Sequence, residues 1–477
     1  MYHPARLALF AAFITVAIHA KKTNIVFVMA DDLAWADVGF NGAKFYETPN
    51  IDALAADGMR FNQAYSGGPN CLPTRACLIS GMYTPRYQIW TPGGKSKGDK
   101  NKMRLNVPGA SDSSDFPSKL SLEPSVTSIA EVLSKAGYKT ARFGKWHVGP
   151  DTQGFDISDS SGKGNGPDGK FYGNINVHEW LTDAGVKFIG DNKGQPFFLY
   201  LSHWDVHTPI RARPEVKAKY TKKLKDGDWD RQWNTTYAAM IEAVDKSVGR
   251  LRATLKEMKL DENTVFIFTS DNGGHAGATT NKPLLGAKGA LFEGGIRVPT
   301  CITWPKTIQA KSVTQTPITS VDFMPTFAEL SGAPLPTNQP VDGKSIVPLL
   351  KGNTLADRAI FWHYPLYLAG SGEGKVVSSF GTQDKAWRGV PSSVIRKGPY
   401  KLIHYFEDDS VALFNIDADR SESQDLAKKQ PELAATLLAE LSSWQKDVKA
   451  PIPSEINPNF GKPASKSKGK KKAKKNE

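Results

Sequence analysis

Three apolar runs, each followed by polar residues, constrain the fold of this chain more than any other feature. The runs are residues 24–30, 196–202 and 264–270. Runs of this kind are typical of strands buried on both faces of a parallel sheet. Asp31 and Asp32 follow the first run, and Asp271 and Asn272 follow the last. Because parallel strands end at one edge of a sheet, we expect these oxygen-bearing side chains to converge and to suit calcium or magnesium better than zinc. A pair of helix-capping aspartates is the alternative for the first two.

Amphipathic helical segments alternate with these runs. The segments are residues 127–137, 177–189 and 235–260. The alternation predicts an α/β fold in which a large, mostly parallel mixed sheet is sandwiched by helices. Beyond residue 352, short runs separated by turns, followed by an amphipathic segment, predict an antiparallel sheet plus a helix. We therefore expect a large domain at 21–352 and a small C-terminal α+β domain at 353–460.

Both ends of the chain differ from the part between them. Residues 1–20 contain an apolar run after Arg6 and read as a secretory signal peptide, with an uncleaved anchor as the alternative. They predict an exported protein, periplasmic or extracellular. Residues 461–477 are rich in Lys and are expected to be disordered, either as a solubility tail or as a contact for polyanions. Most of the formal charge of +13 lies in this tail, so nucleic acid is not expected as a partner.

A Cys-Leu-Pro-Thr-Arg segment at residues 71–75 combines a nucleophile with signals for a helix start. Pro73 suits the first turn of a helix, and Gly81 can close that helix in a left-handed conformation. Cys71 is then placed at a helix N-terminus, where free N–H groups and the helix dipole favour an anion. The segment therefore predicts a nucleophile beside a docking place for a negatively charged group.

The three cysteines of the chain do not form a disulfide framework. A bond between Cys71 and Cys77 is possible and would disable Cys71 as a nucleophile. Cys301 is expected to be a core residue of a strand.

Further cations and imidazoles follow other predicted strands. Lys145 and His147 project to one side if their segment is extended, which suits the binding of an oxyanion. His203 and His207 follow the run at 196–202, and one of them is expected to be an ordinary core or surface residue. Lys288 lies close in sequence to the second acidic strand end.

Taken together and in this order, these segments resemble the type I, formylglycine-dependent sulfatases, which are arylsulfatase-like members of the alkaline phosphatase superfamily. The matching segments are Asp31-Asp32, Cys71-x-Pro-Thr-Arg75, Gly144-Lys-Trp-His147, His207-x-Pro209, Asp271-Asn-Gly273, and Lys288 before Glu293-Gly-Gly-x-Arg-Val-Pro299. The strands around Tyr400 and Leu413 also look like the small domain of the family. Thr74 stands where Ser is commoner, and the rest of the motif is intact.

The resemblance implies that residues 21–352 are a sulfatase catalytic domain that hydrolyses a sulfate ester. It implies that a formylglycine-generating enzyme converts Cys71 to formylglycine. It also implies one calcium ion, with ligands from Asp31, Asp32, Cys71, Asp271 and Asn272. The implied sulfate-handling residues are Arg75, Lys145, His147, His207 and Lys288.

The implied mechanism uses the two hydroxyls of hydrated formylglycine. Asp271 helps to deprotonate one hydroxyl, which attacks sulfur, while neighbouring cations and the metal neutralise the sulfate. His207 or Lys288 protonates the leaving oxygen, and His147 takes the proton of the second hydroxyl so that sulfate is expelled.

Two other functions fit the same sequence. One is a phosphoester or phosphonate hydrolase of the same superfamily, and the other is a non-catalytic binder of sulfated glycans whose residue 71 stays a thiol. Aryl sulfates are possible substrates. The signal peptide, the tryptophans Trp146 and Trp204 near strand ends, and the long polar insertion at 91–125 favour a sulfated carbohydrate outside the cell.

Overall fold

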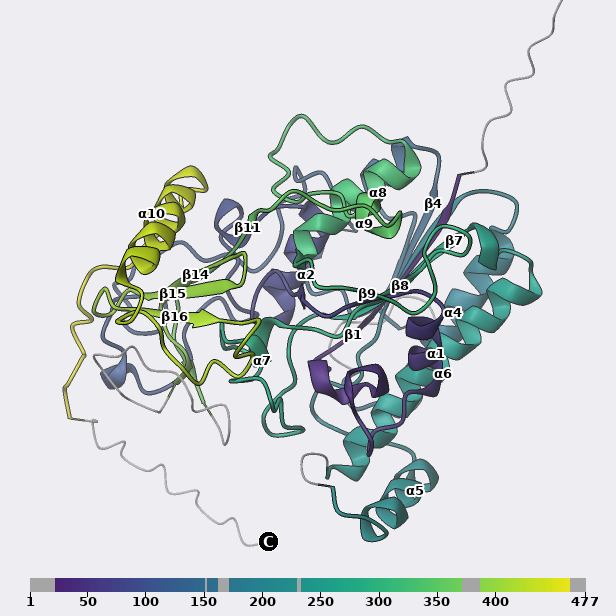
Figure 1. The fold of residues 1–477 in the computed structure, drawn as a ribbon, viewed down its shortest axis with the longest axis horizontal. Coiled ribbons are helices and arrows are strands. Elements are labelled where there is room, and N and C mark those ends of the chain that lie inside the picture. The colour runs from purple at the N-terminus through teal and green to yellow at the C-terminus, as the bar shows by residue number, and fades with distance from the viewer. Residues whose placement is uncertain (1–21, 151, 162–170, 230–232, 371–386, 464–477) are drawn as a thin grey trace, which may run out of the picture.

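The computed structural model describes residues 22–150, 152–161, 171–229, 233–370 and 387–463. The predicted signal peptide and residues 464–477 of the Lys-rich tail lie outside these ranges. Figure 1 shows a large sheet between helices and, beside it, a smaller sheet with one long helix. Among the described residues, no helix combines the length and apolar character that a membrane crossing requires.

The large sheet has eight strands in the order β5-β4-β6-β1-β7-β8-β2-β9. Their bounds are β1 Asn24–Ala30, β2 Met59–Phe61, β4 Lys139–Gly144, β5 Ile157–Asp159, β6 Phe197–Ser202, β7 Thr264–Ser270, β8 Cys301–Thr303 and β9 Ser312–Thr314. All neighbours pair in parallel except β8, which runs antiparallel to β7 and β2. β1 lies at the centre, with Val26 between Leu199 of β6 and Phe266 of β7. The carboxyl ends of β1, β6 and β7 therefore share one edge of the sheet.

Helices cover both faces of this sheet (Figure 1). α1 (Pro49–Ala56), α4 (Val177–Asp191) and α6 (Thr235–Glu257) lie on one face, and α2 (Cys71–Ser80), α3 (Ile129–Lys135) and α8 (Phe323–Ser331) lie on the other. Successive residues of β1 point to opposite faces, so Val28 packs with the first group and Phe27 with the second. Both faces are buried, which explains why the strand sequence is continuously apolar.

The smaller sheet is antiparallel, in the order β11-β14-β15-β16. Its strands are β11 Ala359–Tyr364, β14 Ser392–Lys397, β15 Tyr400–Tyr405 and β16 Val411–Asn415. The helix α10 (Pro431–Asp447) places Leu437 and Leu441 against Leu402 and Leu413 of the sheet. The predicted fold class is thus confirmed, whereas the domain limits at 352 and 460 stay predictions.

The other elements of the described chain lie outside the two main sheets. They are β3 Ala64–Tyr65, β10 Ile318–Thr319, β12 Leu368–Ala369, β13 Trp387–Gly389, α5 Pro214–Lys225, α7 Glu293–Ile296, α9 Val347–Leu350 and the 3-10 helices Trp35–Asp37, Gly39–Asn41, Thr84–Arg86, Lys100–Lys102, Asp261–Asn263 and Ser320–Asp322. β3 pairs with β10, and β12 pairs with β13.

Buried charges join the small sheet to the segment after the large sheet. Lys401 of β15 places its Nζ 3.1 Å from Oε1 of Glu293 on α7 and 2.8 Å from Oε1 of Glu422. All three side chains are fully buried. The hydroxyl of Tyr65 donates to Oε2 of Glu293 (3.0 Å), and the backbone N–H of Glu293 donates to Glu422 (2.7 Å). The two parts of the chain therefore share one polar network.

Local signals in the sequence agree with the helices that form. α2 begins at Cys71 and ends before Gly81, whose φ is 69°. α3 begins with a capping box, in which Ser128 is the N-cap and Glu131 lies in the first turn. The prediction that Lys145 and His147 lie in an extended segment is wrong, because β4 ends at Gly144 and His147 has a φ of 67°.

Candidate active site

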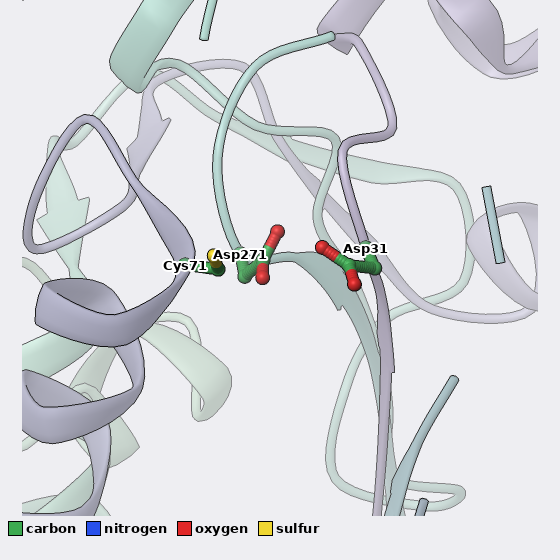
Figure 2. A group of neighbouring side chains, drawn as sticks. All are labelled: Asp31, Cys71 and Asp271. Atoms are coloured by element: carbon green, nitrogen blue, oxygen red, sulfur yellow. The ribbon is translucent and has the colours of Figure 1, made fainter. Parts of the chain in front are cut away.

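Three side chains converge from the ends of two strands and the start of a helix. Figure 2 shows Asp31 after β1, Asp271 after β7 and Cys71 at the start of α2. A carboxylate oxygen of each aspartate and the Sγ of Cys71 all lie within 4.8 Å of one another, and all three residues are buried. The backbone N–H of Asp32 donates to Oδ1 of Asp271 (3.1 Å), and Nδ2 of Asn272 donates to Oδ1 of Asp32 (2.8 Å). The convergence predicted for these strand ends is therefore observed.

The loop before α2 fixes the position of Cys71. Thr74 Oγ1 donates to the carbonyl oxygen of Gly68 (2.8 Å) and accepts from its N–H (3.2 Å), so the loop folds back on the first turn. Cys77 lies further along α2, where its Sγ is 2.9 Å from the hydroxyl of Tyr87. All three cysteines are free and buried, so no Cys71–Cys77 disulfide forms, and Cys301 lies in β8 as predicted.

Three cations surround the convergence point, and each pairs with one carboxylate. The pairs are Arg75 Nη2 with Asp271 Oδ2 (2.7 Å), Lys145 Nζ with Asp31 Oδ2 (2.5 Å) and Lys288 Nζ with Asp32 Oδ1 (2.7 Å). No side chain in these pairs is more than 9% exposed. Each cation also interacts electrostatically with Cys71. The site is thus a buried, alternating array of charges around residue 71.

The three carboxylates respond differently to this crowding. Burial and the negative charge of Asp271 raise the pKa of Asp31 well above its usual value, despite Lys145. Burial also acts to raise the pKa of Asp32, but Lys288, His207 and Lys145 together outweigh it and lower that pKa. The pKa of Asp271 is lowered too, because Arg75, Lys145 and Lys288 together outweigh burial. The protein cations therefore leave Asp31 least well compensated.

Two imidazoles lie at the more open side of the site. His207 is 21% exposed, and its Nε2 is 3.6 Å from Oδ2 of Asp32. Its Nδ1 donates to the carbonyl oxygen of Thr208 (2.5 Å). Burial lowers the pKa of His207 to about 4 although Asp32 opposes the shift. Burial and the charge of Lys145 lower the pKa of His147 well below its usual value. Both rings are therefore neutral near pH 7 in this arrangement.

A family model described as "Sulfatase" matches residues 23–333. The chain belongs to the sulfatase family. A second model, described as "N-sulphoglucosamine sulphohydrolase, C-terminal", matches residues 286–447 of this sulfatase. The protein is therefore a sulfuric ester hydrolase, as the resemblance of its motifs implies.

Relatives of this sulfatase match over most of its length. It is 32% identical to a sulfatase of Formosa agariphila, over 89% of each chain. It is 28% identical to the N-acetylgalactosamine-6-sulfatase of Canis lupus familiaris, over 80% of this chain and 76% of the relative. Among solved structures, it is similar to Ps i-CgsB in complex with k-i-k-neocarrahexaose, with 29% identity, a TM-score of 0.69 and coverage of 92% of this chain and 95% of that one.

The oxygen atoms at the strand ends fit a hard divalent cation. Asp31 Oδ1 and Asn272 Oδ1 are buried, and neither has a hydrogen-bond partner among the described residues. With Asp32 and Asp271 they form a set of oxygen donors, which calcium prefers to nitrogen or thiol ligands. A bound cation would also relieve the crowding that raises the pKa of Asp31. The residues present are therefore suited to calcium.

Three residues of the site were not predicted from the sequence. Lys145 Nζ lies 5.3 Å from the ring centre of Tyr172, whose ring centre is 4.6 Å from that of His207. Tyr172 follows a Gly-rich stretch that carries no pattern. Arg75 Nη1 donates to the hydroxyls of Tyr200 (3.2 Å) and Ser202. Ser202 could have been found, because it ends β6, the parallel neighbour of β1.

The expectation that Trp146 and Trp204 favour a carbohydrate substrate is wrong. Each side chain is only 3% exposed and is therefore not free to stack on a sugar. Trp146 packs edge-on against Phe155, and Trp204 Nε1 donates to a backbone carbonyl oxygen (2.9 Å). His203 is the core histidine of its pair, fully buried with Nε2 3.1 Å from the hydroxyl of Ser247.

Proposed function

We propose that this sulfatase removes sulfate from carbohydrates, using residue 71 as formylglycine and calcium at the strand ends. The observation that carries the proposal is the convergence of Cys71 with Asp31 and Asp271 inside a ring of paired cations. Residue 71 begins a helix, so backbone N–H groups of its first turn add positive potential where a sulfate group would dock.

The protein residues have separable tasks in this proposal. Hydrated formylglycine supplies an oxygen nucleophile with a second hydroxyl, and calcium held by Asp31, Asp32, Asp271 and Asn272 supplies positive charge. Lys145 and Lys288, buried beside residue 71, neutralise the sulfate oxygens. The neutral imidazole of His147 can accept a proton from residue 71. Lys288, whose charged form Asp32 favours, delivers a proton to the leaving oxygen, and His207 can do so only after its Nε2 is protonated.

Two similar proteins support a carbohydrate substrate. One is named for a 6-sulfated N-acetylgalactosamine, and the other was solved with a neocarrahexaose. We extend the proposal to an exported enzyme, in keeping with the signal peptide expected at residues 1–20.

Replacing the nucleophile tests the reaction. Cys71→Ala should abolish desulfation while circular dichroism and the melting temperature stay close to those of the wild type. Cys301→Ala removes a buried cysteine outside the site and should retain activity. A Cys71→Ala protein that keeps most of its turnover contradicts the proposal.

Substrate and cofactor are tested on the wild type. An aryl sulfate, the matching aryl phosphate and a panel of defined sulfated sugars separate a sulfatase from a phosphoester hydrolase and identify the leaving group. Intact mass should show an aldehyde at residue 71 in protein made with a formylglycine-generating enzyme. Chelation should lower the melting temperature, and added calcium should restore it. A melting temperature unaffected by chelator and by calcium contradicts the metal site.

A further inference from the structure

One arginine beside the active site lacks an anionic partner. Arg388 lies on β13, next to Gly389, whose pairing with Leu368 joins β13 to β12. Its Nε is buried and has no hydrogen-bond partner in the part of the chain that the structure describes. A buried guanidinium N–H without an acceptor is unfavourable, because it has lost water without gaining a hydrogen bond or an ion pair. Such a group is poised to bind an anion that comes from outside the chain.

The position of Arg388 ties it to the catalytic residues. A Cβ at Gly289 would lie 3.1 Å from Nε and 3.3 Å from Cδ of Arg388, so the arginine rests on that glycine. Gly289 directly follows Lys288, and its N–H donates to the carbonyl oxygen of Pro69 (2.8 Å), two residues before Cys71. Arg388 therefore lies against the segment that connects the catalytic lysine to the loop of the nucleophile.

A histidine shares this corner of the site. The residue before His275 accepts a hydrogen bond from the backbone N–H of Lys288 (3.1 Å). Nδ1 of His275 accepts from the N–H of Gly277 (3.0 Å), so the ring proton of the neutral form lies on Nε2. Burial lowers the pKa of His275, and the charges of Arg388 and Lys288 lower it further. His275 thus offers a neutral N–H donor next to two cations.

The pairing of charges singles out Arg388. Arg75, Lys145 and Lys288 each have a carboxylate partner. Asp32, whose charge acts on Arg388, is already paired with Lys288. Among the described cations of the site, Arg388 is therefore the one without a carboxylate partner, and it is additional to the cations that face residue 71.

We propose that Arg388, with His275 beside it, binds a second anionic group of the carbohydrate, a sulfate or a uronate carboxylate, next to the ester that is hydrolysed. The planar guanidinium can hold either group through two parallel hydrogen bonds, which a lysine cannot. The inference rests on the proposed function and adds a substrate class, namely sugars that carry a further negative charge near the scissile sulfate.

Binding to a protein that cannot turn over tests this subsite. The full chain with Cys71→Ala is titrated calorimetrically with three probes: N-acetylgalactosamine 6-sulfate, its 4,6-disulfate, and a 6-sulfated disaccharide with a uronate. We expect at least one doubly charged probe to bind more tightly than the monosulfate, by on the order of 10- to 100-fold. Which probe gains shows whether the group is a sulfate or a carboxylate.

Variants then assign the preference to Arg388. Arg388→Gln should remove the preference for the doubly charged probe. Arg388→Lys should keep only part of this preference, because lysine retains the charge but lacks the paired N–H donors of the guanidinium. Arg250→Gln removes an equal charge from the outer surface of α6 and should leave the preference unchanged. Circular dichroism checks that each variant is folded.

Three outcomes overturn the inference. They are equal affinity, or equal lack of affinity, for all probes; a preference that persists in Arg388→Gln; and an equal loss for every probe, which would place Arg388 on the scissile sulfate. Turnover of an aryl sulfate by the wild type is measured in parallel. An absence of turnover contradicts the proposed function, whereas the preference for a doubly charged probe is measured by binding and tests the subsite alone.

Discussion

The buried lysine of the small sheet permits a quantitative test of how the protein is held together. Lys401 is the cation that both Glu293 and Glu422 approach, and none of the three side chains is exposed. Lys401→Met keeps the length and apolar stem of the side chain but removes the charge. It leaves two carboxylates buried with less compensation.

The expected loss of stability is large. Removing one partner of a buried ion pair costs about 3–5 kcal/mol in the free energy of unfolding. Arg297 Nη1, 3.2 Å from Glu293, remains as a cation for that carboxylate, so the lower end of this range is expected. Most of the loss is expected to come from Glu422, because Lys401 is the cation that lowers its pKa.

The pH dependence provides an independent check. Burial raises the pKa of Glu422 from 4.5 to about 7 even with Lys401 present. The folded state therefore binds more protons than the unfolded state between these values, and the contribution of Glu422 to stability falls as the pH rises from 4.5 to 7. Without Lys401 the folded pKa moves higher, so the decline should continue above pH 7 in the variant.

Urea denaturation of the wild type and the variant from pH 5 to pH 8 measures both effects. Lys306→Met is the matched control, because Lys306 pairs with Glu262 on the surface, where the side chains are 72% and 63% exposed. It should change the free energy of unfolding by less than about 1 kcal/mol. Lys401→Met with Glu422→Gln should recover part of the loss. A Lys401→Met protein as stable as Lys306→Met, or with the same pH profile as the wild type, would refute the reasoning.

Three further predictions concern the thiols, a buried histidine and a glycine. No thiol should react with Ellman's reagent in the native protein, since all three cysteines are buried; after unfolding, two should react if residue 71 is formylglycine and three if it is not. Burial lowers the pKa of His363 from 6.5 to about 3, so the folded state binds fewer protons and stability is lost as the pH falls below 6.5. His363→Gln should flatten the melting temperature between pH 4 and pH 6.5, and an unchanged slope contradicts the assignment. At Gly144 (φ 97°) a Cβ would lie 1.8 Å from the carbonyl oxygen of Ser202, whereas at Gly352 (φ 80°) a Cβ would have no atom within 4 Å. Gly144→Ala should therefore cost several times more stability than Gly352→Ala. Equal melting temperatures of the two variants would contradict this.

Much of the fold and site follows from local patterns. The apolar runs specify buried parallel strands because burial on both faces excludes polar alternation. The edge at which such strands end then brings Asp31 and Asp271 together without any knowledge of the loops. The start of α2 follows from Pro73 and its end from Gly81, so the placement of Cys71 could be predicted from its own neighbours.

The rest depends on contacts between distant segments. Tyr172 follows a stretch without periodicity, and its packing on His207 is set by tertiary structure. The burial of Trp146 and Trp204 could not be read from their positions, because a residue near a strand end faces either solvent or a covering loop. His147 was misread because its left-handed backbone interrupts the alternation of an extended segment.

The close packing around Gly289 has a practical consequence. This residue is tied to the Cys71 loop on one side, while Leu368 and Gly389 pack closely on the other. A shortened protein that stops near residue 352 would keep every strand of the large sheet yet expose the flank of the Lys288 loop. Attempts to miniaturise the enzyme, or to graft its large sheet onto another scaffold, should therefore retain the C-terminal segment as part of the reaction centre.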